Sequence, residues 1–136
     1  MRKSPTLVAM AVQILTTAMN KCIFCQVVAG ESPSTKAYED DEVVVIKNIK
    51  PSAPLHYLAI PKRHITSIAA LTRDDIPLMG KLIVVASEVA RELGTEEFGY
   101  KLAYNVGEGG GQVIPHIHLH IIGKTKPEDL LNSVVK

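Results

Sequence analysis

Residues His116 to His120 read His-Ile-His-Leu-His, and Ile121 continues the alternation. A β-strand sends successive side chains to opposite faces, so we predict a strand in which Ile117, Leu119 and Ile121 face a core and the three histidines share the other face. Neighbouring histidines in such a row lie roughly 6.6 Å apart, at about 3.3 Å of rise per residue. Packing alone accounts poorly for this row, because histidine is only intermediate in burial preference and needs partners for both ring nitrogens. The row of histidines predicts a site that binds a small anion or a metal ion.

A second group of residues has the spacing of metal ligands. Cys22-Ile-Phe-Cys25 leaves two residues between two thiols, which lets both reach one tetrahedral zinc ion. A structural zinc site needs four ligands, and His64 and His116 are the candidates for the other two. A redox dithiol and plain burial of two small side chains stay open as alternatives for the same motif.

Four separated motifs carry a family resemblance. They are Cys22-Ile-Phe-Cys25, Tyr38-Glu-Asp-Asp-Glu-Val43, Pro54-Leu-His-Tyr-Leu-Ala-Ile-Pro-Lys-Arg-His64 and His116-Ile-His-Leu-His-Ile-Ile122. In this order, from about Lys21 to Gly123, they resemble the histidine triad nucleotide-binding proteins, and most of all the bacterial and archaeal branch that carries a CxxC. By position, that resemblance implies a zinc ion held by Cys22, Cys25, His64 and His116.

Apolar runs and breakers along the chain indicate an α+β fold. Short strands are predicted at Val43–Ile46, at Tyr57–Ile60 and at Tyr100–Asn105, followed by the Gly-rich loop 107–111 and the histidine strand. The resemblance implies that five strands form one antiparallel sheet with one long and one short helix. It also implies a homodimer that joins across the long helix and the strand before the triad.

The long helix is predicted between Thr72 and Leu93. Apolar residues recur there at helical spacing, at Leu78, Leu82, Val85 and Val89. Thr72 and Asp75 are both possible N-caps, and Pro77 favours Asp75 because proline is tolerated only in the first turn. Thr125-Lys-Pro-Glu128 has the form of a capping box and could start a short terminal helix.

The histidines suggest nucleophilic chemistry at phosphorus. A neutral imidazole is a good nucleophile at pH 7 and leaves readily once protonated, so we expect His118, at the centre of the row, to attack an α-phosphate. A covalent nucleotidyl-histidine would form, and water would hydrolyse it. The resemblance gives His120 a hydrogen bond to a non-bridging phosphate oxygen and His56 a supporting contact. His116 would orient the row through zinc rather than touch the substrate.

Substrate-binding residues are predicted in two places. Glycines in the loop from Asn105 to Gln112 can point backbone N–H groups at one anion, although a glycine cluster between strands is commonly a plain turn. The resemblance implies that Asn105, Gly111 and Gln112 lie at the ribose or phosphate. It also implies an apolar base pocket that includes Phe24, Val27 and Ile49, each of which has the plainer explanation of a core residue.

Two positions depart from the pattern of the family. Asn48 stands where the family commonly carries an acidic residue that accepts hydrogen bonds from ribose hydroxyls, and an amide accepts less strongly than a carboxylate. Val113 stands where many members carry a Ser or Thr able to assist the leaving group. Ribose selectivity and assistance to the leaving group are therefore the two properties that these substitutions affect.

Length and composition agree with one compact domain, and the resemblance implies that this HIT-like domain covers residues 21–136 and follows an extension over residues 1–20. A formal net charge of +1 argues against a nucleic-acid surface, and two cysteines at metal spacing suggest a reducing cytoplasm. The extension has a basic start and an apolar run from Thr6 to Met19, interrupted by Gln13. This run is shorter than the roughly 20 residues that span a membrane, so we expect no stable membrane insertion.

The resemblance implies a purine-nucleotide hydrolase or transferase of the phosphoramidase type, acting at the α-phosphate of nucleoside phosphoramidates. A dinucleoside polyphosphate hydrolase is the alternative within the same class of enzyme. Asn48 and Val113 favour a third alternative, a nucleotide-binding or scaffold protein with vestigial activity. A catalytic zinc site built on the three histidines of the row is a fourth, because a His-x-His pair on a strand permits it.

Overall fold

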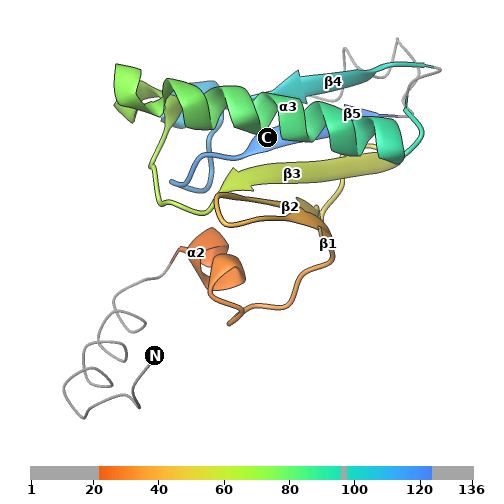
Figure 1. The fold of residues 1–136 in the computed structure, drawn as a ribbon, viewed down its shortest axis with the longest axis horizontal. Helices are drawn as coiled ribbons and strands as arrows, with labels where there is room; N and C mark the ends of the chain where they lie inside the picture. Colours follow the sequence, from red (N-terminus) through yellow and green to blue (C-terminus); the bar gives the residue numbers. More distant parts are fainter. Residues whose placement is uncertain (1–21, 96–97, 124–136) are drawn as a thin grey trace.

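Five strands form one antiparallel sheet in the computed structural model, which describes residues 22–95 and 98–123. Their order across the sheet is β1-β2-β3-β5-β4 (Figure 1). The strands are β1 (Lys36–Glu39), β2 (Val43–Lys47), β3 (Leu55–Pro61), β4 (Tyr100–Ala103) and β5 (Leu119–Gly123). The described part of the chain also forms α-helices α2 (Ile23–Val28) and α3 (Ile76–Glu92) and three 3₁₀ turns, η1 (Ile68–Ala70), η2 (Arg73–Asp75) and η3 (Glu108–Gly110). The predicted α+β fold, a five-stranded antiparallel sheet with one long and one short helix, is confirmed.

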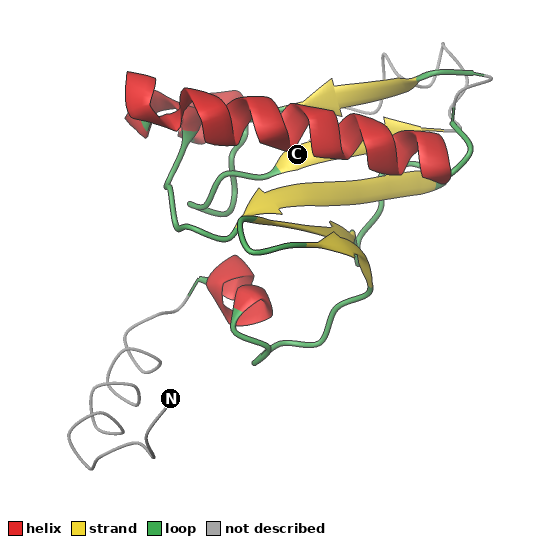
Figure 2. Cartoon of the chain, viewed as in Figure 1, coloured by secondary structure: helices red, strands yellow, loops and turns green. Residues whose placement is uncertain are grey.

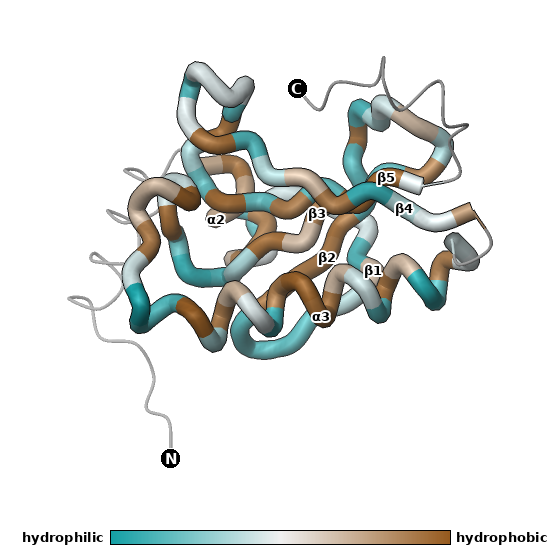
Figure 3. Tube along the Cα trace, turned by 90° about the horizontal axis from the view of Figure 1, so that it is seen from above, coloured by the Kyte–Doolittle hydropathy of each residue, from teal (hydrophilic) through white to brown (hydrophobic). Residues whose placement is uncertain are grey.

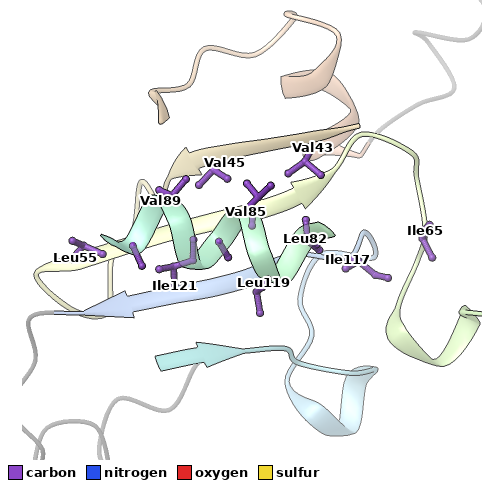
Figure 4. Close-up of a cluster of buried hydrophobic side chains, with 13 residues drawn as sticks. Val43, Val45, Leu55, Ile65, Leu82, Val85, Val89, Ile117, Leu119 and Ile121 are labelled. Carbon is purple, nitrogen blue, oxygen red and sulfur yellow. The ribbon is translucent and has the colours of Figure 1, made fainter. Parts of the chain in front are cut away.

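The long helix α3 covers one face of the sheet. Figure 3 shows hydrophobic residues concentrated in the strands and recurring along this helix. The buried residues of α3 are Leu82, Val85, Ala86, Val89 and Ala90. They pack against Val43, Val45, Leu55, Ala59, Ile117, Leu119 and Ile121 (Figure 4). Alternate residues of three strands therefore face α3, as the period of two in a strand requires.

The start of α3 agrees with the predicted cap. Asp75 is the N-cap residue and Pro77 lies in the first turn, where proline removes no helical hydrogen bond. Thr72 caps a different element: it is the N-cap residue of η2 and forms a capping box with Asp75. Both candidates for the cap are therefore used, one for each of two successive helical turns.

The opposite face of the sheet carries α2 and the histidines. Phe24 and Val27 of α2 pack on Val44, Ile46, Leu58 and Ile60, which are the strand residues that point away from α3. Figure 2 shows this short helix next to the sheet and separate from α3. His56 of β3 and His120 of β5 alternate with the residues that face α3, so they lie on the α2 face. This arrangement brings α2 and the histidines to the same side of the sheet.

The histidine strand is shorter than predicted. β5 begins at Leu119, since its register with β3 starts at the pair Ala59 and Leu119. Upstream of that pair, the Ile117 N–H donates to the carbonyl of Ile65, in the loop after β3, at 2.8 Å. The predicted alternation still holds, because Ile117, Leu119 and Ile121 all belong to the core under α3.

Other elements differ in extent from the predictions. The strand predicted over Tyr100–Asn105 ends at Ala103, whereas β2 and β3 are slightly longer than their predicted runs. Neither α2 nor β1 was predicted from the residues, since six and four residues are too few to show a periodic pattern. The predicted extension over residues 1–20 and the capping box at Thr125–Glu128 lie outside the described residues. Within those residues, no helix combines the length and apolar character needed to cross a membrane.

Candidate active site and metal centre

Two cysteines and two histidines from distant segments meet at the start of α2. The ligand atoms of Cys22, Cys25, His64 and His116 all lie within 4.8 Å of one another. Cys25 Sγ lies 3.1 Å from His64 Nδ1, and Cys22 Sγ lies 3.4 Å from His116 Nδ1. The two Nδ1 atoms are 3.1 Å apart. Ligand atoms of a tetrahedral zinc site are separated by about 3.3 to 3.8 Å, given its bond lengths, so the cluster has the size and the donor atoms that zinc requires.

The tautomer of His116 also suits a metal ligand. Its Nε2 lies 2.8 Å from the carbonyl oxygen of Pro61 and donates to it, which leaves Nδ1 without a proton and directed at the cysteines. Burial lowers the pKa of His116, so the ring is neutral at pH 7. A ligand histidine whose other nitrogen donates to a backbone carbonyl is the usual arrangement around zinc. These four residues could hold a metal ion.

One ring nitrogen of His118 has no hydrogen-bond partner among the described residues. Its Nδ1 lies 2.8 Å from the carbonyl oxygen of His116 and donates to it, so Nε2 carries the lone pair. Burial lowers the pKa of His118, which keeps the imidazole neutral. The residue is 9% exposed and lines a cavity on this face, together with Phe24 and His120. A neutral, oriented imidazole with an available Nε2 is the form that a nucleophile needs.

His56 and His120 form a hydrogen-bonded pair behind the cavity. The backbone N–H of Ser52 donates to His56 Nδ1 at 3.0 Å, so the proton of the neutral His56 ring is on Nε2. His56 Nε2 lies 2.8 Å from His120 Nδ1 and donates to it. His120 must then carry its own proton on Nε2, which is buried without a hydrogen-bond partner in the described chain. The hydrogen bonds that run from the Ser52 N–H through His56 to His120 therefore end at the Nε2–H of His120, which is a donor at the cavity lined by His118 and His120.

Burial explains why these rings stay neutral. It lowers the pKa of His120 to about 3, with further lowering by the neighbouring His118 and His56. The pKa of His56 is also lowered, first by burial. The rings of His118 and His120 are 4.9 Å apart between centroids. A buried donor with no partner costs free energy unless a ligand supplies an acceptor.

The cavity beside these histidines is largely apolar and has a volume of about 410 Å³. Phe24, Val27 and Ile49 line it, as the sequence predicts for a base pocket, and so does Asn48. Phe24 and Val27 are buried, whereas Ile49 is 88% exposed at the rim. Val113 also lines the cavity and is 79% exposed, with no hydroxyl to offer a ligand.

The side chains of the glycine loop make hydrogen bonds within the protein. Gln112 Nε2 donates to the carbonyls of Thr66 and Ile114, and its Oε1 accepts from the Gly107 N–H. Asn105 Nδ2 donates to the carbonyl of Gly110. Gly111 adopts a positive φ of 83°, which glycine tolerates without strain. Neither these two amides nor Gly111 belongs to the lining of the histidine cavity. In the structure these residues stabilise the conformation of the loop. Their direct contact with substrate stays a prediction.

The sequence did not predict contacts made by backbone groups or contacts between aromatic rings. The Ser52 N–H, which fixes the tautomer of His56, leaves no pattern in the sequence because any residue other than proline supplies it. The Phe24 ring lies 5.8 Å from the ring of His116 and 5.0 Å from that of His118. Arg63 donates to the carboxylate of Asp75, which also accepts from the Thr72 N–H and thereby has a lowered pKa. Arg63 therefore ties the segment that carries His64 to the start of α3.

The fold and the site define a protein in which a row of three histidines leads into a central strand of an antiparallel sheet. A family model described as "Scavenger mRNA decapping enzyme C-term binding" matches residues 21–135. Together with the relatives below, this match shows that the chain belongs to the histidine triad (HIT) family.

Two curated relatives illustrate the similarity in sequence. Protein HitA of Neisseria gonorrhoeae is 45% identical over 105 residues, covering 77% of this chain and 97% of the relative. The purine nucleoside phosphoramidase of Escherichia coli is 37% identical over 101 residues, covering 74% of this chain and 88% of that enzyme.

Two solved structures illustrate the similarity in fold. A HIT family hydrolase from Legionella pneumophila superposes with a TM-score of 0.76 at 40% identity, over 78% of this chain and 95% of that one. A Zn-bound histidine triad family protein from Mycobacterium smegmatis has a TM-score of 0.67 at 30% identity, over 79% and 78% of the two chains. These relatives support a hydrolase of the HIT family.

Proposed function

We propose that the protein hydrolyses purine nucleoside phosphoramidates or related nucleotides at the α-phosphate. The observation that carries this proposal is the orientation of His118, whose Nδ1–H is anchored on the His116 carbonyl while Nε2 is free at an apolar cavity. Similarity to the purine nucleoside phosphoramidase of E. coli supports the same substrate class.

The reaction divides into two displacements. In the first, the Nε2 lone pair of His118 forms a bond to the α-phosphorus, and the bond from phosphorus to the amine nitrogen breaks. The departing amine takes a proton from solvent. In the second, water attacks the nucleotidyl-histidine, the bond from phosphorus to Nε2 breaks, and a nucleoside monophosphate leaves with the free histidine restored. His120 Nε2–H is the donor available to a non-bridging oxygen as negative charge grows there, and His56 holds the tautomer of His120.

The remaining site residues act in binding. Phe24, Val27 and Ile49 would contact the base, Asn48 would lie at the ribose, and the loop with Asn105, Gly111 and Gln112 would border the phosphate. The apolar lining of the cavity and its position against the histidines support this division.

Zinc is the proposed cofactor, held by Cys22, Cys25, His64 and His116. When bound, it would supply folding energy by joining α2 to the loop after β3 and to the segment before β5. The similarity to a Zn-bound histidine triad protein supports this choice. Among the described residues, the group of side chains close enough to hold a metal ion includes His116 but neither His118 nor His120, which argues against a catalytic zinc on the three triad histidines.

A homodimer and a cytoplasmic location complete the proposal. The outer face of α3 exposes Ile76, Ile83 and Val84, and β4 is the last strand of the sheet in the described part of the chain. Cys22 and Cys25 form no disulfide, and a pair of cysteines at metal-ligand spacing is typical of proteins from a reducing compartment. We also propose that residues 21–136 form the HIT-like domain and that residues 1–20 are an added segment.

A panel of substrates tests the proposal. We expect the protein to release AMP from adenosine 5′-phosphoramidates, with a transient adduct of the nucleotide visible by intact mass. Faster turnover of dinucleoside polyphosphates would favour that alternative hydrolase. Binding of AMP without turnover of any compound would favour a nucleotide-binding or scaffold protein, the alternative that the exposed Val113 supports.

A further inference from the structure

Phe24 connects the cavity proposed to bind the nucleotide to the cluster of possible metal ligands, which is Cys22, Cys25, His64 and His116. The residue lies between the two cysteines in sequence, and its side chain lines the cavity. Its side chain is 4% exposed and lies edge-on to two histidine rings, 5.8 Å from that of His116 and 5.0 Å from that of His118 between centroids. One side chain therefore contacts a candidate metal ligand and the candidate nucleophile, and it also forms part of the wall of the cavity.

The backbone makes a second connection between the two sites. The carbonyl oxygen of His116, whose ring belongs to the cluster, accepts the hydrogen bond from His118 Nδ1 at 2.8 Å. The His116 ring is fully buried and donates from Nε2 to the carbonyl of Pro61. A shift of His116 would therefore alter the hydrogen bond that orients His118. The cluster and the cavity are joined both through a side-chain ring and through the backbone.

Helix α2 is the element whose position affects both sites. A helix of six residues is not stable by itself in water, so contacts with the rest of the chain must hold it. These contacts include the packing of Phe24 and Val27 on the sheet and the approach of the two cysteines to His64 and His116. A thiol is only a weak hydrogen-bond donor. Ligation of one metal ion by both cysteines and both histidines would therefore favour the position of α2 seen in the structure, which we call the docked position.

We propose that metal at the cluster and nucleotide in the cavity bind cooperatively, because each favours the docked position of α2. The inference rests on the proposed function and adds a form of regulation to that site. A ligand shifts an equilibrium only through a difference in its affinity for the two states. Metal has that difference because docking brings the cysteines to the histidines, and a base has it because docking supplies Phe24 and Val27 to the cavity. Each ligand must then raise the affinity for the other by the same factor, which we expect to be about 10-fold.

Two titrations of the full-length protein test the coupling. The first compares the dissociation constants of AMP for the zinc-loaded protein and for protein freed of metal by a chelator, and we expect zinc to tighten AMP binding about 10-fold. The second measures zinc affinity by competition with a chromophoric chelator, with and without saturating AMP, and should give the same factor. Adenosine replaces AMP in a parallel series, because it lacks a phosphate that could bind zinc directly. The coupling should persist with adenosine.

Variants locate the coupling. Phe24→Leu should lower the factor toward one, because leucine keeps an apolar wall but loses the ring contacts with His116 and His118. Ile46→Val is the matched control, since Ile46 is buried in the same apolar cluster and lines the same cavity, but from β2. This control should change AMP affinity equally with and without zinc. All titrations are run below the melting temperature of the metal-free protein, so that folded forms are compared.

The outcomes separate this inference from the proposed function. Equal affinity of the zinc-loaded and metal-free forms for AMP overturns the inference alone, since nucleotide still binds. A protein that takes up no zinc overturns it, and so does a metal-free chain that is unfolded at every temperature, because metal would then hold the whole fold rather than α2. Coupling that disappears with adenosine, or that is unchanged in Phe24→Leu, also overturns it, since another route would then connect the sites. Failure of every nucleotide to bind either form overturns the proposed function as well.

Discussion

At the scale of single residues, hydrogen bonds to the backbone decide which histidine can react. His116 and His118 are two residues apart, yet one donates from Nε2 to Pro61 and the other from Nδ1 to His116. The lone pair consequently faces the cysteines in His116 and the cavity in His118. The same residue type thus has two tautomers and two different tasks.

The first prediction concerns the nucleophile. His118→Ala should remove turnover of adenosine phosphoramidates and the covalent adduct while AMP still binds, because the substitution deletes the attacking nitrogen and leaves the apolar wall in place. Steady-state rates, intact mass and calorimetric titration measure the three properties. Hydrolysis at near the parental rate would show that another group attacks phosphorus.

Val113 is the second residue with a specific consequence. Val113→Ser should speed hydrolysis of substrates with poor leaving groups by about 10-fold, because a positioned donor contributes about 10² to 10⁴ and an introduced hydroxyl is imperfectly placed. Activated substrates should gain little, since little charge accumulates on their departing atom. Rates for a series of amines of graded basicity measure this dependence. A uniform gain across the series would mean that position 113 shapes the cavity instead of assisting departure.

At the scale of secondary-structure elements, the cluster of two cysteines and two histidines that could hold a metal ion brings the start of α2 next to His64 and His116. α2 has six residues, contributes Phe24 and Val27 to the cavity, and is held by the packing of these two side chains on the sheet and by the contacts of Cys22 and Cys25. Phe24 lies between the two cysteines in sequence and touches the rings of both His116 and His118. Metal at the cluster would therefore stabilise the nucleotide pocket as well as the helix.

Elemental analysis tests this connection. Protein purified without chelator should contain one zinc per chain, and Cys22→Ser or Cys25→Ser should lose the zinc and melt at a lower temperature, because binding energy at a structural site is folding energy. Ser32→Ala, also on the cavity wall but outside the cluster, is the matched control and should keep the metal. Metal-free parental protein whose melting curve equals that of the serine variants would contradict the prediction.

Close packing at the end of β5 leads to another prediction. A Cβ atom at Gly123 would lie 2.7 Å from Cγ2 of Thr95, whose side chain is fully buried and donates to the Ala90 carbonyl at the end of α3. Gly123→Ala should lower the free energy of unfolding by about 1 to 3 kcal/mol, as overpacking of a filled interior does. Urea denaturation measures the change, with the exposed Gly109→Ala as control. Equal stability of the two variants would show that Thr95 can move without cost.

At the scale of the whole molecule, the proposed dimer places exposed apolar residues in an interface. Ile83→Glu and Val84→Glu, at positions that are 48% and 57% exposed, should convert the dimer into a monomer, because a carboxylate is costly to bury without a partner. Sedimentation analysis measures the mass. Ile49→Glu, at an exposed apolar position of the cavity rim, should leave the mass unchanged. A parental protein that sediments as a monomer would remove the dimer from the proposal.

The sequence by itself determined the features that repeat at short range or have a fixed spacing. The alternation at Ile117, Leu119 and Ile121 identified the face toward the core, and the apolar spacing with Pro77 located α3 and its cap. The two-residue gap between Cys22 and Cys25, with His64 and His116, identified the four residues that cluster in space. Such patterns are readable because side-chain direction follows directly from the period of a helix or strand.

The tertiary structure alone decided how the histidines are used. The carbonyls of Pro61 and His116 and the N–H of Ser52 set three tautomers, and a backbone group has no signature in the sequence. The same holds for Gln112, whose amide bonds to Thr66 across 46 positions of chain to fix the loop. Each of these interactions needs two segments brought together by the packing of the sheet, so only the folded chain determines which ring nitrogen is free.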